Sequence, residues 1–399
     1  MKSKSIALGL FGLVALGLLL LAAAAQLFQP SPAAHIPPEP AEAAASDTAS
    51  SAPAGFFAAN WNVENLFDTA DDPRNRKDNE FLPRNPDTRW TRKRFETKLE
   101  NLAEVITHMN GGAGPDLLGL EEIENRSVLE SLVQKLPGQS YGIVHEDSPD
   151  PRGIDTALLY NRALFELVDS RTHRVNLRWH RDTRDILQAD FRGPDGRLLH
   201  VFVNHWPSRG SGTKQSDPER FTAARTLSRA LRPVFQQDTN AHVLILGDFN
   251  DEPSSRSVRV VLDVKPYSSR TDIRPDRLYN LTAAKSAQGW GTYFHSFNGR
   301  NEFRMYDQII ASGALLRGAR IEYQDDSLWI VQPDFMTESR GWRKGAPVST
   351  YRDRDRYQGG YSDHFPIGAR FVFIQPSAPD GESQAPEAPA AEADAPVLW

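Results

Sequence analysis

The chain has 399 residues, of which 39% are hydrophobic and 25% are charged, and it contains no cysteine. This is ordinary globular composition, and the lack of cysteine excludes disulfide bonds, thiolate nucleophiles and cysteine-ligated zinc. The net charge is −6, but the two ends hold two of the 46 basic and eight of the 52 acidic residues, so residues 56–374 are neutral. A neutral central region excludes a uniformly basic nucleic-acid-binding protein but is compatible with a local basic groove.

The N-terminus has the pattern of an export signal. A short basic stretch precedes the apolar run over residues 6–21, and a row of alanines follows it. One interpretation is a signal peptide over residues 1–25, cleaved after the alanines. The other is a retained membrane anchor, because residues 6–28 contain Gln26 as their only polar residue and are long enough to span a bilayer. Both interpretations predict export to the periplasm, the cell exterior or an outward-facing membrane surface.

Two segments have the composition of disordered chain. Residues 26–55 are rich in Ala, Pro, Ser and Glu, and residues 375–399 are similar and acidic. Both contain too little apolar surface to offset the entropy lost on ordering. We therefore predict an Ala/Pro-rich linker, one folded domain over residues 56–374 and a disordered acidic tail.

The folded region mixes helical and strand patterns. Apolar residues at helical spacing predict helices over residues 90–109, 128–136 and 219–235. Short apolar runs that end in Gly or polar residues predict strands over residues 56–65, 116–120, 157–160, 199–206, 243–246, 305–310 and 367–373. Strands and helices do not alternate strictly, which predicts an α/β protein with mixed sheets. Residues 325–360 are expected to form a long insertion loop.

Polar side chains follow several of these apolar runs. They occur in NWNVENLFD (60–68), LLGLEEIEN (117–125), FVNHWPSRG (202–210), ILGDFNDEP (245–253), and the pair MYDQII (305–310) and YSDHFP (361–366). Loops at strand ends commonly carry active sites. Carboxylate and amide oxygens favour Mg²⁺ or a similar ion over zinc. No Ser or Cys lies in a nucleophile context, so we expect water to attack phosphorus with help from a carboxylate and a metal.

The order and spacing of these strings resemble the endonuclease/exonuclease/phosphatase superfamily, over residues 56–374. The resemblance implies a four-layer α/β sandwich of two packed mixed β-sheets flanked by helices. It also implies a hydrolase of phosphate esters that uses Mg²⁺, with Mn²⁺ or Ca²⁺ as possible substitutes.

The resemblance also implies roles for individual residues. The metal ligands would be Asn62, Glu122 and Asp363. The catalytic residues would be His205, Asp248, Asn250, Asp307 and His364. In this scheme Asp248 orients or deprotonates the attacking water, and Asp307 orients His364 toward the phosphate. Asp155 lies near a position where relatives place substrate contacts, and the cations expected to hold substrate are Arg152, Arg209 and Arg352.

Each of these assignments has a simpler alternative. Glu122 and its neighbours Glu121 and Glu124 could be an exposed acidic strand end. Arg209 could be an ordinary loop residue. The basic runs over residues 89–94 and 171–184, with Trp90 and Trp179, could bind a nucleic-acid backbone or be solvated helix faces. The aromatic and basic side chains of residues 325–360 could contact substrate or pack the loop onto the domain.

The sequence therefore predicts an exported, divalent-metal-dependent phosphodiesterase, with a nuclease (an endonuclease) as the preferred reading. A phosphatase or a phospholipase-C-like hydrolase of the same fold is the alternative enzyme. Inositol phosphatases carry a Trp-Cys-Asp-Arg string where this chain has MYDQ, which weakens the phosphatase reading. A surface-anchored binding module without catalysis is the alternative of another class, although an intact set of site residues argues against it. Nucleic acid is the expected partner, and no protein partner is indicated.

Overall fold

The computed structural model describes residues 55–374, apart from 73–77, 139, 211, 298, 318–319 and 353–355. The predicted signal or anchor, the linker and the acidic tail lie outside the described residues, so their assignments stay predictions. Within the described part of the chain, no helix is long and apolar enough to cross a membrane.

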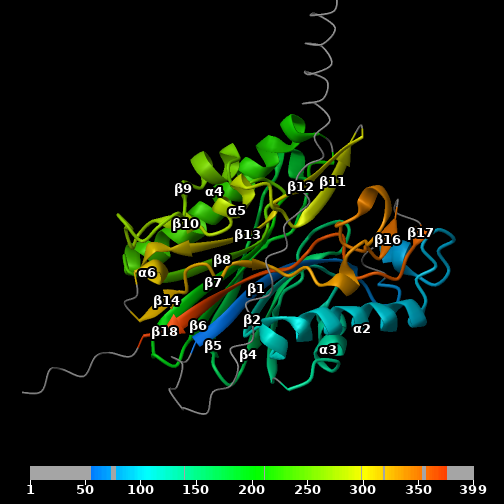
Figure 1. Cartoon of the computed structure of the whole chain (residues 1–399), viewed down its shortest axis with the longest axis horizontal. Coiled ribbons are helices and arrows are strands. Elements are labelled where there is room, and N and C mark those ends of the chain that lie inside the picture. Colours follow the sequence, from blue (N-terminus) through cyan, green and yellow to red (C-terminus); the bar gives the residue numbers. More distant parts are fainter. Residues whose placement is uncertain are drawn as a thin grey trace, which may run out of the picture. The chain divides into compact units, whose positions relative to one another are not determined.

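Two seven-stranded mixed sheets form the centre of the domain (Figure 1). Sheet A contains, in spatial order, β14 (Ile321–Tyr323), β18 (Ile367–Phe373), β1 (Gly55–Leu66), β2 (Leu117–Ile123), β4 (Asp155–Asn161) and β3 (Tyr141–His145), and β15 (Trp329–Ile330) also pairs with β18. Sheet B contains β5 (Glu166–His173), β6 (Ile186–Arg192), β7 (Leu198–His205), β8 (His242–Asp248), β13 (Asp307–Ser312), β10 (Leu278–Asn280) and β9 (Val264–Pro266).

The remaining elements are helices, single turns and two hairpins. The α-helices are α2 (Arg92–His108), α3 (Arg126–Val133), α4 (Thr213–Gln237), α5 (Ala283–Ala287) and α6 (Gly313–Leu316). The hairpins are β11 (Tyr293–Phe297) with β12 (Arg300–Arg304), and β16 (Tyr351–Arg352) with β17 (Arg356–Tyr357). Shorter helical turns are η1 (Asp78–Phe81), η2 (Asn110–Gly112), η3 (Arg178–His180), η4 (Ser257–Val261), η5 (Asp334–Met336) and η6 (Gly341–Arg343).

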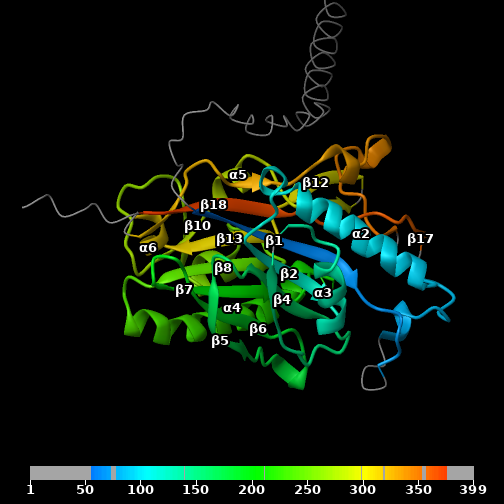
Figure 2. The ribbon, with the colours of Figure 1, turned by 90° about the horizontal axis from the view of Figure 1, so that it is seen from below.

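The elements stack in four layers, which confirms the predicted fold class. One apolar cluster joins α2 and α3 to sheet A, a second lies between the two sheets, and a third joins α4 to sheet B. In Figure 1 the layers follow one another from α4 at the top to α2 and α3 at the bottom. Figure 2, seen from below, shows α2 and α3 beside β1 and β2 of sheet A. Burial of an apolar face by each element is the physical reason for this layering.

The alternation of side chains along β1 explains how one strand serves both the core and the site. Trp61 and its odd-numbered neighbours point toward α2 and belong to the outer cluster, whereas Ala58 points between the sheets. Because side chains alternate with a period of two, Asn60 and Asn62 lie on the same inner face as Ala58. Both asparagines are buried. The inner face of β1 thus changes from apolar to polar toward its C-terminal end.

Several strands were missed by the apolar pattern, for identifiable reasons. β5 is a largely exposed edge strand without an apolar run. β6 is buried but contains Gln188 and Asp190, whose side chains bond to each other at 2.9 Å. The prediction of an insertion loop over residues 325–360 was wrong in part. β15 extends sheet A from this segment, and β16 and β17 form a hairpin within it.

His242, at the start of β8, makes the stability of the fold depend on pH. It is 2% exposed, and among the described residues neither ring nitrogen has a hydrogen-bond partner. Burial lowers the pKa of His242 to about 4, against a small opposing effect of Asp195. The unfolded chain therefore binds the proton first, so stability is present above pH 6.5 and is lost as the pH falls toward 4.

Because of this histidine, we expect the free energy of unfolding to fall by about 2 kcal/mol when the pH is lowered from 7 to 5, as the linkage between its pKa shift and stability requires. Urea unfolding of the wild type and of His242→Leu at both pH values measures it. The difference in stability between the two proteins should change by that amount in favour of the leucine variant at pH 5. A difference that does not depend on pH would contradict the assignment of a neutral buried histidine.

Candidate active site

Strand register brings the polar strand ends of sheet B together. Asp248, the last residue of β8, pairs with His205 at the end of the parallel strand β7. It also pairs with Asp307 at the start of the antiparallel strand β13. Parallel strands end, and antiparallel neighbours begin, at the same edge of a sheet. Three residues that are far apart in the sequence therefore meet at one edge.

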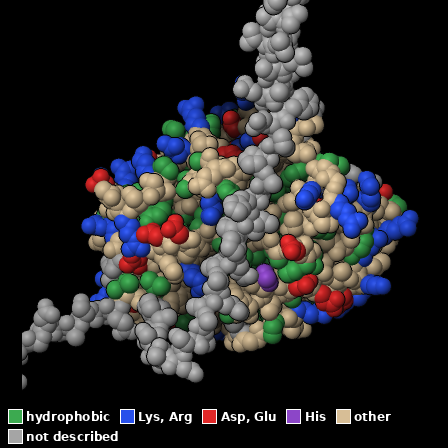
Figure 3. All heavy atoms as spheres, in the orientation of Figure 1, with side chains coloured by type: hydrophobic (Ala, Val, Ile, Leu, Met, Phe, Trp, Pro, Cys, Tyr) green, Lys and Arg blue, Asp and Glu red, His purple; other side chains and the backbone are tan. Residues whose placement is uncertain are grey.

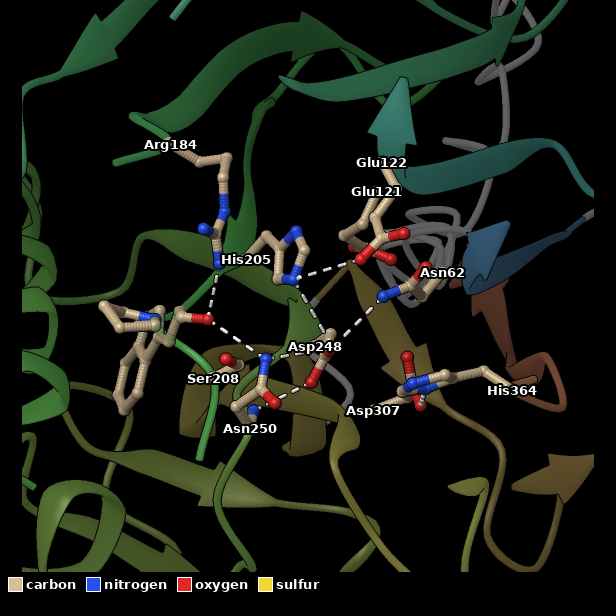
Figure 4. A network of polar contacts seen from close by, with 12 residues as sticks. Asn62, Glu121, Glu122, Arg184, His205, Ser208, Asp248, Asn250, Asp307 and His364 are labelled. Carbon is tan, nitrogen blue, oxygen red and sulfur yellow. Dashed lines mark hydrogen bonds and ion pairs between the residues drawn. The ribbon is translucent and has the colours of Figure 1, made fainter. Parts of the chain in front are cut away.

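Asp248 lies at the centre of a hydrogen-bond network (Figure 4). Its Oδ1 accepts the backbone N–H of Asn250 at 2.8 Å, and its Oδ2 accepts Nδ2 of Asn250 and Nδ2 of Asn62, both at 3.2 Å. Burial, with a contribution from Asp307 and against the lowering effect of His364, raises the pKa of Asp248 to about 7. A carboxylate whose pKa lies near neutrality is suited to accept a proton at physiological pH.

The turn after β8 has little conformational freedom. Gly247 has φ +149°, and a Cβ there would lie 2.1 Å from the backbone oxygen of Asn204. Asn250 itself adopts φ +48°, and its Nδ2 donates to the backbone oxygen of Trp206 at 3.0 Å. Non-glycine residues in the left-handed region are uncommon and concentrate at functional sites. The GDFN string thus holds two side chains of the site in a fixed relative position.

A bulge in sheet A directs Glu122 toward the site. The pairing of β2 with β4 shifts between Glu121 and Ile123, and Glu122 has φ +65°. Regular alternation would place Glu121 and Glu122 on opposite faces, and a bulge re-aims a side chain locally. As a result, Oε1 of Glu122 lies 4.0 Å from Nε2 of His205, which belongs to the other sheet. The Glu122 side chain is 13% exposed, so solvent ions can reach it.

His364 and Asp307 form a buried pair. Nδ1 of His364 lies 2.7 Å from Oδ2 of Asp307, and Oγ1 of Thr292 donates to the same oxygen at 2.5 Å. The backbone oxygen of His364 accepts the indole N–H of Trp61 at 2.9 Å. Burial by itself would lower the pKa of His364, but the charge and hydrogen bond of Asp307 raise it well above its ordinary value. The pair with Asp307 therefore favours the protonated form of His364.

His205 has the opposite electrostatic character. Its Nε2 lies 3.6 Å from Oδ2 of Asp248, and its Nδ1 has no hydrogen-bond partner among the described residues. Burial lowers the pKa of His205 well below its ordinary value, and Arg184 and Arg152 lower it further. The pKa values of the two histidines are thus shifted in opposite directions, which suits separate roles in proton transfer and charge stabilisation.

The residues around Glu122 and Asp363 fit a divalent cation. Burial raises the pKa of Asp363, and repulsion by Glu122 contributes to the rise. Burial also raises the pKa of Glu64 to about 8, and Asp363 adds to that effect. Buried carboxylates that repel one another are relieved by a bound cation, and oxygen donors are those that Mg²⁺ prefers. The predicted ligands Glu122, Asp363 and Asn62 would hold it.

The structure adds residues that the sequence patterns did not single out. Glu121 is fully buried, and its Oε2 accepts Nδ2 of Asn60 at 3.2 Å. The exposed-strand-end alternative is therefore wrong for Glu121. Burial, with Asp307 and Asp248, raises its pKa well above the ordinary value. These residues carry no local signal, because their importance comes from partners on other strands.

The four predicted substrate contacts lie in different surroundings. Arg152 lies at the site, with Nη2 3.8 Å from Glu122 and 2.6 Å from Oδ1 of Asn65. Asp155 instead bonds to Nε2 of His145 at 3.1 Å and to the backbone N–H of Ser148 at 2.8 Å. Asp147 lies close to both side chains. His145, Asp147 and Asp155 each offer one atom that could bind a metal ion, and these three atoms lie within 4.8 Å of one another.

The other two arginines are engaged by acidic partners. Arg209 forms an ion pair with Asp251, and its Nε donates to the backbone oxygen of Asn250 at 2.8 Å, which ties the loops after β7 and β8 together. Arg352 forms an ion pair with Glu338 within the insertion. Trp90, which the sequence placed in a basic run that could bind a nucleic-acid backbone or be a solvated helix face, is fully buried and donates to the backbone oxygen of Phe67, so both readings are wrong for Trp90.

Comparison with known proteins agrees with this architecture. A family model described as the endonuclease/exonuclease/phosphatase family matches residues 57–375. A protein of that family from Bacteroides thetaiotaomicron has 16% identity and a TM-score of 0.50, covering 81% of this chain and 99% of its own. The human Nocturnin catalytic domain with bound sulfate has 17% identity and a TM-score of 0.47, covering 80% of this chain and 95% of its own.

Zebrafish (D. rerio) TDP2 complexed with a single-strand DNA product has 16% identity and a TM-score of 0.48, covering 79% of this chain and 98% of its own. No curated protein matches. The family match extends over nearly the whole described domain and includes every string that supplies the site. This chain belongs to the endonuclease/exonuclease/phosphatase family, whose members are hydrolases of phosphoester bonds.

Proposed function

We propose that this protein is an exported, divalent-metal-dependent phosphodiesterase that cleaves nucleic acid. The observation that carries the proposal is the position of Asp248. Its carboxylate has a pKa near 7 and is fixed by Asn62 and Asn250. At the edge of sheet B it pairs with Asp307, which holds His364, and with His205, which Glu122 approaches from sheet A. A proton acceptor, a cationic donor and a metal-ligand group within one site are the components of phosphoester hydrolysis.

The chain's own residues supply most of the chemistry. Asp248 takes a proton from the water that attacks phosphorus, and Asn250 keeps the carboxylate oriented. His364, kept protonated by Asp307, donates a hydrogen bond to a non-bridging phosphate oxygen and stabilises the charge that develops there. A divalent ion held by Glu122, Asp363 and Asn62 would polarise the phosphoryl group. The neutral His205 is placed to bind a phosphate oxygen beside Asp248.

Features around the site favour nucleic acid over a small phosphate ester. Arg89 and Lys93 are exposed at the N-terminal end of α2, near where Lys98 of the same helix approaches the site. Figure 3 shows Lys and Arg side chains gathered over the end of the domain where Figure 1 places β16 and β17. In the insertion, the Trp342 side chain is 61% exposed. Cations along a path and an exposed aromatic ring suit a polynucleotide backbone and its bases.

A substrate panel tests this function. We expect the purified protein with Mg²⁺ to nick or degrade plasmid DNA or RNA, and to release little phosphate or phosphocholine from inositol phosphates or sphingomyelin. Preferential hydrolysis of inositol phosphates or sphingomyelin would favour the phosphatase or phospholipase-C-like alternative. Failure on every substrate with intact metal binding would favour a binding module. Cell fractionation tests export, which a cytoplasmic pool would contradict.

A further inference from the structure

One face of α2 is bonded to the chain segment that leads into Asp363. Lys98 is 1% exposed, and its Nζ donates to the backbone oxygen of Tyr361 at 2.6 Å and to Oγ1 of Thr350 at 2.6 Å. One turn further along the helix, Nδ2 of Asn101 donates to the backbone oxygens of both Gly359 and Gly360 at 2.9 Å. Residues three apart on a helix lie on the same face, so the two side chains act on adjacent carbonyls.

The bonded segment cannot relax independently of the site. Tyr361 is two residues before Asp363, and the intervening Ser362 donates from Oγ to the backbone oxygen of Asn62 at 2.6 Å. The same Oγ accepts the backbone N–H of His364 at 3.1 Å. The carbonyls held by α2 are therefore linked, through Ser362, to the predicted metal ligands Asn62 and Asp363 and to His364.

The segment is also packed too closely to take another path. A Cβ at Gly360 would lie 2.3 Å from the backbone oxygen of Val348, and the backbone N–H of Tyr361 donates to that oxygen at 2.7 Å. On the opposite side, Glu64 accepts the backbone N–H of Thr350 at 2.6 Å and of Tyr351 at 3.2 Å. Glu64 lies two residues after Asn62 in β1, so β1 also holds Thr350 and Tyr351, which precede the bonded segment in the chain.

We propose that Lys98 and Asn101 are positioning residues of the metal site, which hold the backbone at residues 359–361 and thereby fix Asp363 opposite Glu122. This inference rests on the proposed function only in assuming that Asp363 and Glu122 bind the ion. Groups that orient metal ligands typically change metal affinity by roughly 10–100-fold when they are removed. The ion that this site would bind is a hard divalent cation.

Asn101 allows the test to be made without a change in buried charge. We expect Asn101→Leu to weaken Mn²⁺ binding, measured by titration calorimetry on the full chain, by roughly tenfold or more. With substrate, kcat at limiting metal should fall while KM changes little, and excess Mn²⁺ should restore much of kcat. Lys98→Met should, like Asn101→Leu, weaken Mn²⁺ binding and lower kcat at limiting metal. Glu100→Gln, an exposed position on the same helix, is the matched control and should bind Mn²⁺ like the wild type.

Three results would overturn the inference. Asn101→Leu with a lower melting temperature but unchanged Mn²⁺ affinity would show a purely structural role. Tighter Mn²⁺ binding by Lys98→Met, with no change in Asn101→Leu, would show that Lys98 acts only as a counter-charge. Glu100→Gln weakening Mn²⁺ binding as much as Asn101→Leu would show a non-specific effect of α2. A wild type that binds Mn²⁺ but cleaves no nucleic acid would instead refute the proposed substrate and leave this inference testable, because calorimetry needs no turnover.

Discussion

Replacing Asp248 by asparagine should lower kcat by roughly 10²–10⁴-fold, the typical cost of removing a positioned acid–base group. Asparagine keeps the size of the side chain, and its Oδ1 can still accept the backbone N–H of Asn250, so we expect a folded protein. The variant loses the proton acceptor that the attacking water requires. Steady-state kinetics at saturating Mg²⁺, together with circular dichroism, measures both expectations.

The pH profile supplies a second check on the same residue. The pKa of Asp248 is raised to about 7, and only its ionised form accepts a proton. Activity should therefore be full above about pH 8 and should fall about tenfold per pH unit below pH 7. In Asp248→Asn this acidic limb should disappear from the residual activity. Asp263→Asn, an exposed residue in an ion pair with Lys265, is the control and should keep the wild-type profile. Near-wild-type turnover in Asp248→Asn would refute the role as base.

Replacing Glu122 by glutamine should abolish most of the metal-dependent activity. The substitution removes the charge of the predicted main ligand and keeps the length of the side chain. Metal assistance is worth several kcal/mol of transition-state stabilisation, which corresponds to a loss of at least about a hundredfold in rate. We expect the same loss when wild-type protein is treated with excess EDTA, with recovery on addition of Mg²⁺. Calorimetry should show much weaker Mn²⁺ binding by the variant.

Glu124→Gln is the matched control for this experiment. Glu124 follows Glu122 by two residues, and its Oε2 accepts the backbone N–H of Asp68 at 2.7 Å. Burial raises the pKa of Glu124 to about 8, so it is largely neutral at pH 7, and glutamine should reproduce that state. We expect near-wild-type activity and metal affinity. Full turnover by Glu122→Gln in excess EDTA would exclude the metal mechanism.

The sequence by itself predicted an α/β protein with mixed sheets and polar residues at strand ends, and the family resemblance implied the four layers and the candidate residues. The apolar periodicity of α2 and the apolar run of β1 are local properties, and both elements appear in the structure at the expected positions. The pairing of His205, Asp248 and Asp307 follows from strand register, because polar residues at the ends of apolar runs meet when those runs pair. The roles of these residues in catalysis and metal binding remain predictions.

Only the tertiary structure decided how individual side chains are used. Glu121 and Glu122 are neighbours with the same chemistry, and the bulge at Glu122 separates a fully buried acid from a solvent-accessible one. Arg209 and Arg352 looked like free cations, but each has an acidic partner. Lys98 carries a charge that favours the surface, yet it is buried in α2 and bonds to a carbonyl 263 residues away. Local patterns fix which face of an element is apolar. The partner of a polar side chain depends on contacts between distant segments, which no local pattern contains.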